Sequence, residues 1–219
     1  MSIGPTGLIG FGAGRTITVV QTDTGADTTN SQAVTTFSGK SLGVAAADRV
    51  VVVGVSGWAT NFAVSSLTIG GVSAAAVVSL ANGFDIVEMW SAVVPTGTTG
   101  DVVVTFAGGQ DACGIDVLAM YNANGAAAYA TASDTDSDPA SVAIAAPGGG
   151  AVIGYCGLRS NTDRTFIWTG LTEAADGVVE TGTSTQTAAY GYGGGTITCT
   201  PSGAGVRNPL MALASWSAA

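Results

Sequence analysis

Short runs of apolar residues, separated by turn-forming residues, recur along the chain. The run RVVVVGV at 49–55 is continuous, which is typical of a strand covered on both faces. In DVVVTFAGG, Val102, Val104 and Phe106 occupy every second position and therefore share one face of a strand. Between two alternating stretches, the pair at 70–71 is Gly-Gly, which predicts a two-residue hairpin because both central positions of a type I′ turn need positive φ.

About ten strand candidates of this kind follow one another, and no segment keeps a 3.6-residue period. The pattern predicts an all-β fold, a single antiparallel β-sandwich that is jelly-roll-like. The polar segment 22–32 is predicted to be a loop, and the chain is expected to turn at 147–150. Asp48 and Arg49 are expected at the mouth of the strand whose valines enter the core.

The first fourteen residues differ from the rest of the chain. Glycine stands at five of these positions and is interspersed with apolar residues such as Leu8, Ile9 and Phe11. Glycine at this density disfavours a helix, since each glycine costs about 1 kcal/mol relative to alanine. We expect an extended, glycine-rich N-terminal arm over 1–14 that lies on the body or on a neighbouring subunit, and one β-sandwich domain over 15–219.

The composition narrows the choice of partners. Six basic residues against 15 acidic residues give a net charge of -9, which argues against nucleic acid and against an anionic membrane. No apolar run approaches the roughly 20 residues of a membrane-spanning helix, and the N-terminus lacks the features of a secretory signal. Because only 10% of the residues are charged, the surface is expected to be rich in Thr, Ser, Asn, Gly and Ala and suited to contacts with copies of itself or a neighbour.

Several kinds of catalytic and cofactor site are disfavoured by the residue types present. The chain has no histidine, which excludes a Ser-His-Asp hydrolase. The segment around Lys40 resembles a phosphate-binding loop, but Val34 stands where that motif needs glycine. Cys113, Cys156 and Cys199 have no close spacing, so we expect buried free thiols, made in a reducing compartment, and no zinc site or other cofactor.

Two groups of acidic residues are candidates for chemistry. Asp134, Asp136 and Asp138 alternate as in the first half of a calcium loop, but a proline follows where the loop needs glycine, so a bound cation and a solvated acidic loop both remain open. Asp85 and Glu88 are the best pair for acid–base work. Their spacing places them on opposite faces of a strand, so they are not expected to converge.

Two further groups suggest binding. Trp58, Trp168, Tyr190 and Tyr192 can form a sugar-stacking platform, or they can belong to the core and its rim. The threonines at 181, 183, 185 and 187 recur at every second position and are expected to share one exposed strand face.

Four phrases within 38–125 together resemble virion structural proteins of tailed bacteriophages, the β-sandwich proteins that decorate or cement the head or form fibres. These phrases are KSLGVAAADRVVVVGVSG, LTIGGVSA, MWSAVVPTGTTGDVVVTF and IDVLAMYNANG. The resemblance covers little more than a third of the chain and carries no functional residue with it. It implies a non-enzymatic capsid decoration protein that binds the major capsid protein on the outside of the head.

The expected protein is a homo-oligomer, with a trimer as one option, and it is made in the cytoplasm of the bacterial host before it joins the virion. The alternative is a tail-fibre or receptor-binding module that recognises host surface glycan through Trp58, Tyr190 or Tyr192. A third class, a polysaccharide-cleaving enzyme, requires that Asp85 or Glu88 act on a substrate.

Overall fold

Antiparallel strands make up the regular structure of the protein. The computed structural model describes residues 15–58, 63–83, 85–135, 137–203 and 209–219. Those residues form 17 strands and no helix, which confirms the all-β prediction. The predicted arm, 1–14, lies outside the described residues.

The strands form four sheets, two in each half of the chain. The N-terminal inner sheet has the order β1-β9-β3-β7-β6, with bounds Thr18–Asp27, Ala112–Tyr121, Val50–Trp58, Asp85–Val93 and Ala75–Ala81. The N-terminal outer sheet has the order β2-β8-β4-β5, with bounds Gln32–Ser41, Thr99–Gln110, Val64–Ile69 and Val72–Ser73.

The C-terminal half is built in the same way. The C-terminal inner sheet has the order β10-β17-β12-β15-β14, with bounds Ala130–Asp134, Leu210–Trp216, Ala151–Arg159, Ser184–Tyr192 and Thr172–Glu180. The C-terminal outer sheet has the order β11-β16-β13, with bounds Ala140–Ile144, Gly195–Pro201 and Phe166–Thr169.

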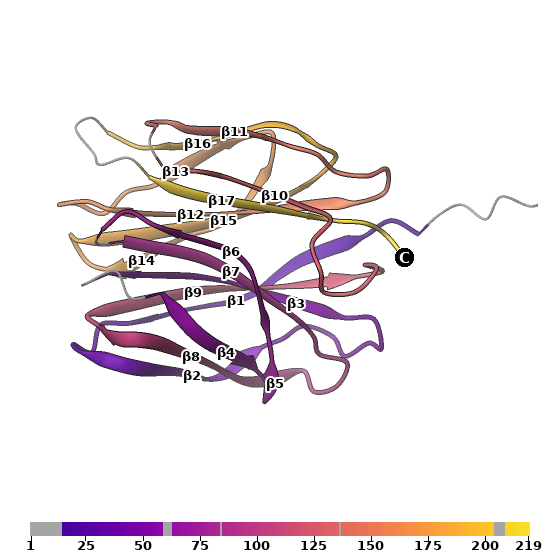
Figure 1. Ribbon diagram of the computed structural model, residues 1–219, viewed down its shortest axis with the longest axis horizontal. Coiled ribbons are helices and arrows are strands. Elements are labelled where there is room, and N and C mark those ends of the chain that lie inside the picture. The colour runs from indigo at the N-terminus through magenta and orange to yellow at the C-terminus, as the bar shows by residue number, and fades with distance from the viewer. Residues whose placement is uncertain (1–14, 59–62, 84, 136, 204–208) are drawn as a thin grey trace, which may run out of the picture.

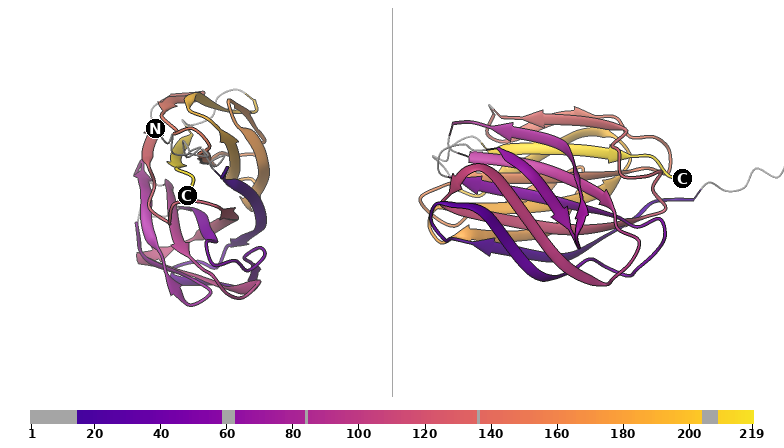
Figure 2. Two further views of the ribbon diagram at one scale, coloured as in Figure 1. Left: turned by 90° about the vertical axis from the view of Figure 1, so that its right-hand side faces the viewer. Right: turned by 60° about the horizontal axis from the view of Figure 1, so that its bottom comes forward.

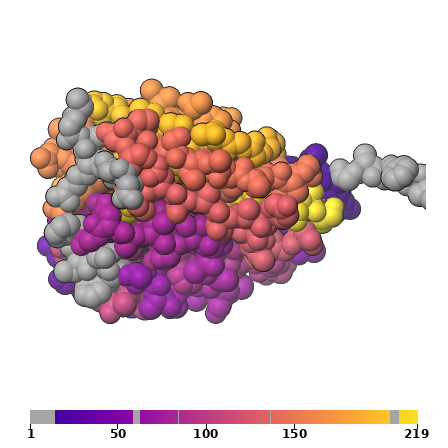
Figure 3. Space-filling view, turned by 45° about the horizontal axis from the view of Figure 1, so that its top comes forward, coloured from indigo at the N-terminus to yellow at the C-terminus, as the bar shows by residue number. Residues whose placement is uncertain are grey.

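The four sheets are stacked as layers, with the two inner sheets in the middle (Figure 1). Each half is therefore a sandwich-like pair of sheets, and the inner sheets pack face to face. The end-on view shows the same layering (Figure 2). On one side of the molecule β6 and β10, from different halves, lie next to each other (Figure 3).

The two halves repeat one strand order. In chain order, β1, β2, β3 and β4 correspond to β10, β11, β12 and β13, and β6 to β9 correspond to β14 to β17. Only the short β5 has no counterpart among the described strands. The fold is thus an internal duplication, and the sequence prediction of a single sandwich is corrected to two sandwich-like halves.

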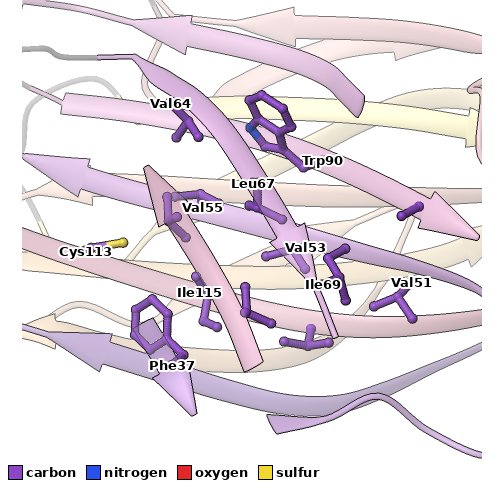
Figure 4. Packing of buried hydrophobic residues seen from close by; sticks show 14 of the residues in the cluster. Phe37, Val51, Val53, Val55, Val64, Leu67, Ile69, Trp90, Cys113 and Ile115 are labelled. Carbon is purple, nitrogen blue, oxygen red and sulfur yellow. The ribbon is translucent and has the colours of Figure 1, made fainter. Parts of the chain in front are cut away.

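The valine run at the start of β3 lies between two cores, as the sequence predicts. Val51 and Val53 point into the core of the N-terminal half, where they meet residues such as Leu67 (Figure 4). Val50 and Val52 point to the opposite side, into the core between the two inner sheets. Each of these fully buried valines stabilises the fold by about 1.5–3 kcal/mol through apolar burial.

The two inner sheets approach closely where glycine faces an aromatic ring. A Cβ on Gly54 of β3 would lie 2.4 Å from the ring of Tyr155 on β12. The Tyr155 side chain is fully buried, and so is Trp216 on β17, which belongs to the same core. The missing side chain at Gly54 therefore makes room for the tyrosine between the halves.

The segment predicted as a polar loop is largely strand. Residues 22–27 belong to β1, and β2 begins at Gln32, so only 28–31 connect them. The prediction was wrong because β1 is an edge strand, on which polar side chains alternate with partly buried ones. Thr22 and Asp23 are tied to Ser41, whose amide donates to Asp23 over 2.7 Å.

Two local predictions are confirmed. Gly70 and Gly71 join β4 to β5 with φ of 57° and 80°, as a type I′ hairpin requires. Arg49 directly precedes β3, is fully buried, and donates hydrogen bonds of 2.7–2.8 Å to the carbonyl oxygens of residues 43, 94, 96 and 97. The arginine thus holds two loops against the mouth of the strand.

Candidate functional site

The best carboxylate pair does not form an acid–base site. On β7, Ile86 and Trp90 point into the N-terminal core, whereas Val87 and Met89 point toward the other half. Glu88 and Asp85 follow the same alternation, so they face opposite sides of the sheet, as the sequence predicts.

The environment of Glu88 is that of a structural acceptor. Its carboxylate is almost fully buried and accepts hydrogen bonds from the Val64 amide, the Ser79 hydroxyl and the Trp90 indole, at 3.0, 3.0 and 2.8 Å. Both oxygens are engaged, and three elements converge on this one side chain. Glu88 therefore fastens β4, β6 and β7 together and offers no free oxygen to a substrate.

Two of the four candidate aromatics are engaged within the fold. The guanidinium carbon of Arg159 lies 3.7 Å from the centroid of the Trp58 ring, and the Trp58 indole donates to Glu180 over 2.8 Å. Trp168 is buried and donates to the Thr187 hydroxyl over 3.0 Å. One face of Trp58 is therefore covered, and Trp168 belongs to the core of the C-terminal half.

Tyr190 and Tyr192 lie at the C-terminal end of β15. Tyr192 is 59% exposed, and its ring packs edge-on against Tyr190 with centroids 6.5 Å apart. Beside Tyr192 is a hollow of about 660 Å³, bounded by the start of β1 and by the turn at 146–150. Of the predicted aromatic platform, Tyr192 is the residue that lines this hollow.

The acidic loop is internally bonded. Asp134 accepts hydrogen bonds from the Ser137 hydroxyl and from the Ser141 amide, the latter over 2.7 Å. Asp136 lies outside the described residues. Within the described ranges, no group of three or more His, Cys, Asp and Glu side chains is arranged to hold a metal ion.

The predicted threonine face is not where the sequence placed it. Residues 181–183 form a turn before β15, and Thr185 and Thr187 are buried in the C-terminal half. The expectation was wrong because β15 is an interior strand of its sheet and both of its faces are covered.

Rows of small uncharged side chains, some exposed and some half-buried, lie instead on the two outer sheets. On the N-terminal outer sheet, Thr36, Val103 and Thr68 face one another across three strands. The neighbouring row is Val34, Thr105 and Ser66.

The C-terminal outer sheet presents an equivalent row of Ser141, Thr198 and Thr169. The hydroxyl oxygens of Ser141 and Thr198 lie 3.0 Å apart. The two outer sheets, at opposite ends of the stack, thus both carry rows of Ser and Thr on their outer faces, with Val added on the N-terminal one.

A buried polar cluster between the halves was not predicted. Gln186 on β15 accepts hydrogen bonds from the hydroxyls of Ser56 and Tyr155 over 2.6 and 2.7 Å, and donates to the Ile115 carbonyl over 3.0 Å. Asp116 on β9 is fully buried beside it. The only sequence signal was a single aspartate inside the apolar strand GIDVLAMY.

The pKa of Asp116 is raised to about 7, chiefly by burial and also by the nearby charge of Asp176, although hydrogen bonds from Gln186 and Gln21 act in the opposite direction. Its Oδ2 atom is buried without a hydrogen-bond partner. This carboxyl is enclosed between the sheets, so its titration bears on the packing of the two halves and not on an open active site.

The three cysteines are free and buried, as predicted. Burial raises the pKa of Cys113 and Cys199 well above the ordinary value for a thiol. Among the described residues there is no helix with the length and apolar character needed to cross a membrane.

Comparison with known proteins identifies no relative in sequence. No protein-family model matches the chain, and no curated protein matches it. Function is therefore argued from the fold, the surface and the residues themselves.

Proposed function

We propose that the protein is a non-enzymatic structural component of a phage particle, a decoration protein that binds the outside of the head. The observation that carries this proposal is the pair of outer sheets whose outward rows consist of exposed and half-buried Ser and Thr side chains, with Val on the N-terminal sheet. Such rows bury little charge on contact with a neighbour, so the contact avoids the cost of desolvating charged groups. The phrases within 38–125 that resemble virion structural proteins point to the same role.

The order of the strands supports a jelly-roll assignment for each half. In a jelly roll, eight antiparallel strands form two sheets that are connected as two Greek keys. In the C-terminal half, eight strands divide between the orders β10-β17-β12-β15-β14 and β11-β16-β13. The fifth strand, β14, pairs with β15 at the edge of the inner sheet, and β6 pairs with β7 in the same way. We therefore infer a tandem of two jelly-roll-like sandwiches in which this edge strand has joined the inner sheet.

The proposed partners are the major capsid protein and further copies of this chain. A molecule with similar surfaces at both ends of a layered stack can contact two neighbours at once, and many weak contacts then add up through avidity. The apolar and glycine-rich segment 1–14 is the proposed anchor to the capsid. The net charge of -9 is consistent with a position outside the shell, away from the packaged nucleic acid.

The test is co-sedimentation of the purified protein with capsid shells assembled without it. Val103→Glu and Thr198→Glu each place a charge at the centre of one outer sheet, and Val178→Glu on the edge strand β14 is the control. We expect at least one outer-sheet variant to weaken binding about tenfold or more, because an unpaired charge is desolvated in the contact. Unchanged binding of both outer-sheet variants contradicts the assignment of these surfaces, and failure of the wild-type protein to bind contradicts the proposed function.

A further inference from the structure

The hollow beside Tyr192 has the features of a ligand site. Its volume of about 660 Å³ falls within the usual range for small-molecule pockets, roughly 300–1,000 Å³. It lies at the end of the molecule where β1 begins and β17 ends (Figure 1). Two of the segments that line the hollow are joined by a hydrogen bond of 3.1 Å from the Ile17 amide to the Gly149 carbonyl. Two chain segments from different halves therefore form one wall.

The aromatic wall of the hollow is held in a fixed orientation. Tyr190 packs edge-on against the Tyr192 ring at an interplanar angle of 77°, and the Tyr192 hydroxyl accepts a hydrogen bond from the Val19 amide over 3.4 Å. Even so, more than half of the Tyr192 side chain is exposed. A large aromatic surface that is oriented by its neighbours and left open to solvent is ready to stack against a ligand.

The rest of the lining is polar but uncharged. Thr16 and Thr18 are exposed and line the hollow with the glycines at 148–150 and 193, of which 148, 149 and 193 are exposed. The Gly149 carbonyl and the Gly150 amide are already hydrogen-bonded to Ile17 and Pro147. Pro147 adds a second apolar surface. Among the described residues that line the hollow, Tyr192 is the only one with an ionisable side chain, so a charged ligand finds no counter-ion among them.

We infer that this hollow binds a neutral saccharide, one ring of which stacks on Tyr192. A pyranose ring has an apolar C–H face that fits against an aromatic ring, and hydroxyl groups around its edge. Those hydroxyls match the threonine side chains and the bare backbone of the glycine turn. A peptide strand lacks such a flat apolar face, and an anionic sugar lacks a partner for its charge.

The site does not depend on attachment to a capsid. Saccharide binding is measured on the purified full-length chain, whereas the decoration role is measured with capsid shells. Either result can therefore fail while the other stands. Loss of shell binding leaves the saccharide site intact, and an empty hollow leaves the decoration role untouched.

The experiment is an NMR titration of the full-length chain, labelled at its five tyrosines, with neutral hexoses and N-acetylhexosamines. Glucuronate serves as the charged counterpart. We expect millimolar binding of at least one neutral sugar with a shift of the Tyr192 resonance, and binding of glucuronate that is weaker by about tenfold or more. No response to any neutral sugar overturns the proposal.

Variants separate stacking from a general surface effect. Tyr192→Ala is expected to weaken binding about tenfold or more, whereas Tyr192→Phe, which keeps the ring, stays within about threefold. Tyr129, 60% exposed and outside the hollow, supplies the matched control: Tyr129→Ala leaves the affinity unchanged. Equal loss in Tyr192→Ala and Tyr129→Ala contradicts the site.

A variant that leaves Tyr192 in place provides a second check. Gly148 lines the hollow, and a Cβ at this position meets no atom within 4 Å, so Gly148→Leu adds a side chain at the wall without a clash. We expect it to block the sugar. A synthetic peptide of residues 1–14 is added in parallel; if the peptide shifts Tyr192 and the sugars do not, the hollow belongs to the N-terminal segment and the saccharide proposal is wrong.

Discussion

At the scale of single residues, a charge on Asp116 opposes the packing of the two halves, because its carboxyl is buried between the inner sheets. It shares the space between the inner sheets with Gln186 and Tyr155, and with the charge of Asp176 nearby. In the folded protein its pKa is about 7, above the value of 3.8 for an unperturbed aspartate. The folded state therefore favours the protonated form, and it loses stability as the pH rises from about 4 to 7.

We predict that Asp116→Asn removes much of this loss. The difference between pKa values of 3.8 and about 7 corresponds to at most about 4 kcal/mol above pH 7. In urea unfolding at pH 5 and pH 8, the variant is expected to lose less stability than the wild type between the two pH values.

Asp23 is a useful comparison for this measurement. Partial burial alone would raise its pKa, but hydrogen bonds from the amides of Ser41 and Thr24 and the charge of Lys40 lower it overall. Asp23→Asn is therefore expected to reduce stability at both pH values, with no gain at pH 8. If Asp116→Asn behaves in the same way, the account of Asp116 is wrong.

A second prediction for a single residue concerns Gly54. A methyl group at this position would lie 2.4 Å from the Tyr155 ring, which is fully buried and cannot move aside freely. Gly54→Ala should destabilise the protein by about 1–3 kcal/mol through overpacking. Gly148→Ala meets open space and should change stability by less than about 0.5 kcal/mol in the same urea titration. Equal effects of the two variants would show that the close approach does not matter.

At the scale of elements, Arg49 joins the start of β3 to two loops. Its guanidinium donates to four backbone carbonyls, which a lysine cannot reproduce because its ammonium group lacks the planar fork of donors. Arg49→Lys should cost about 2–4 kcal/mol and speed up amide hydrogen exchange at 43–48 and 94–98. Arg15→Lys, at an exposed position, is the control and should have almost no effect. Unchanged exchange in both loops contradicts this role.

Some strands and turns could be predicted from the sequence, and others could not. The run in β3 and the hairpin at Gly70 and Gly71 follow local rules, because burial on both faces and positive φ leave clear patterns. The strand β1 follows no such rule, since an edge strand carries polar residues on its exposed positions. Which strand of a sheet lies at the edge is decided by tertiary packing, so the loop prediction for 22–32 failed.

The internal duplication could not be recognised from the sequence, because the most similar segments of the two halves do not align face to face. The segments VVVGVSG in β3 and AVIGYCG in β12 look alike when their glycines are aligned. In the structure, however, Gly54 faces the other half, whereas Gly154 faces Trp168 and Leu171 within its own half. Aligning the glycines therefore reverses the faces of the strand, and only the order of the strands reveals the repeat.

For the candidate site residues too, some features could be predicted from the sequence and others could not. The opposite orientation of Asp85 and Glu88 followed from strand periodicity alone. The surroundings of Trp58 and Tyr192 could not be predicted in this way. Arg159, which covers Trp58, and the turn at 146–150, which lies beside Tyr192, come from distant parts of the chain. Contacts of this kind depend on the stacking of the sheets, which no local pattern encodes.

At the scale of the whole molecule, the two halves share a core and should unfold together. The inner sheets bury residues such as Met89, Met120 and Trp216 between them, and either half alone exposes this apolar surface to water. We predict one cooperative thermal transition, with equal calorimetric and van't Hoff enthalpies.

Fragments provide a direct check of this coupling. A chain of residues 15–125 is expected to aggregate or dimerise when produced alone, and to become soluble when produced together with 126–219. A stable, folded monomer of 15–125 would contradict the shared core as a requirement for folding.

The central claim is that this duplicated fold is a surface component of a phage head. The most direct measurement is immunogold electron microscopy of purified particles, with an antibody raised against the recombinant protein. We predict gold distributed evenly over the head. Gold confined to the tail tip or fibres, or no labelling of particles from cells that express the protein, would contradict the claim.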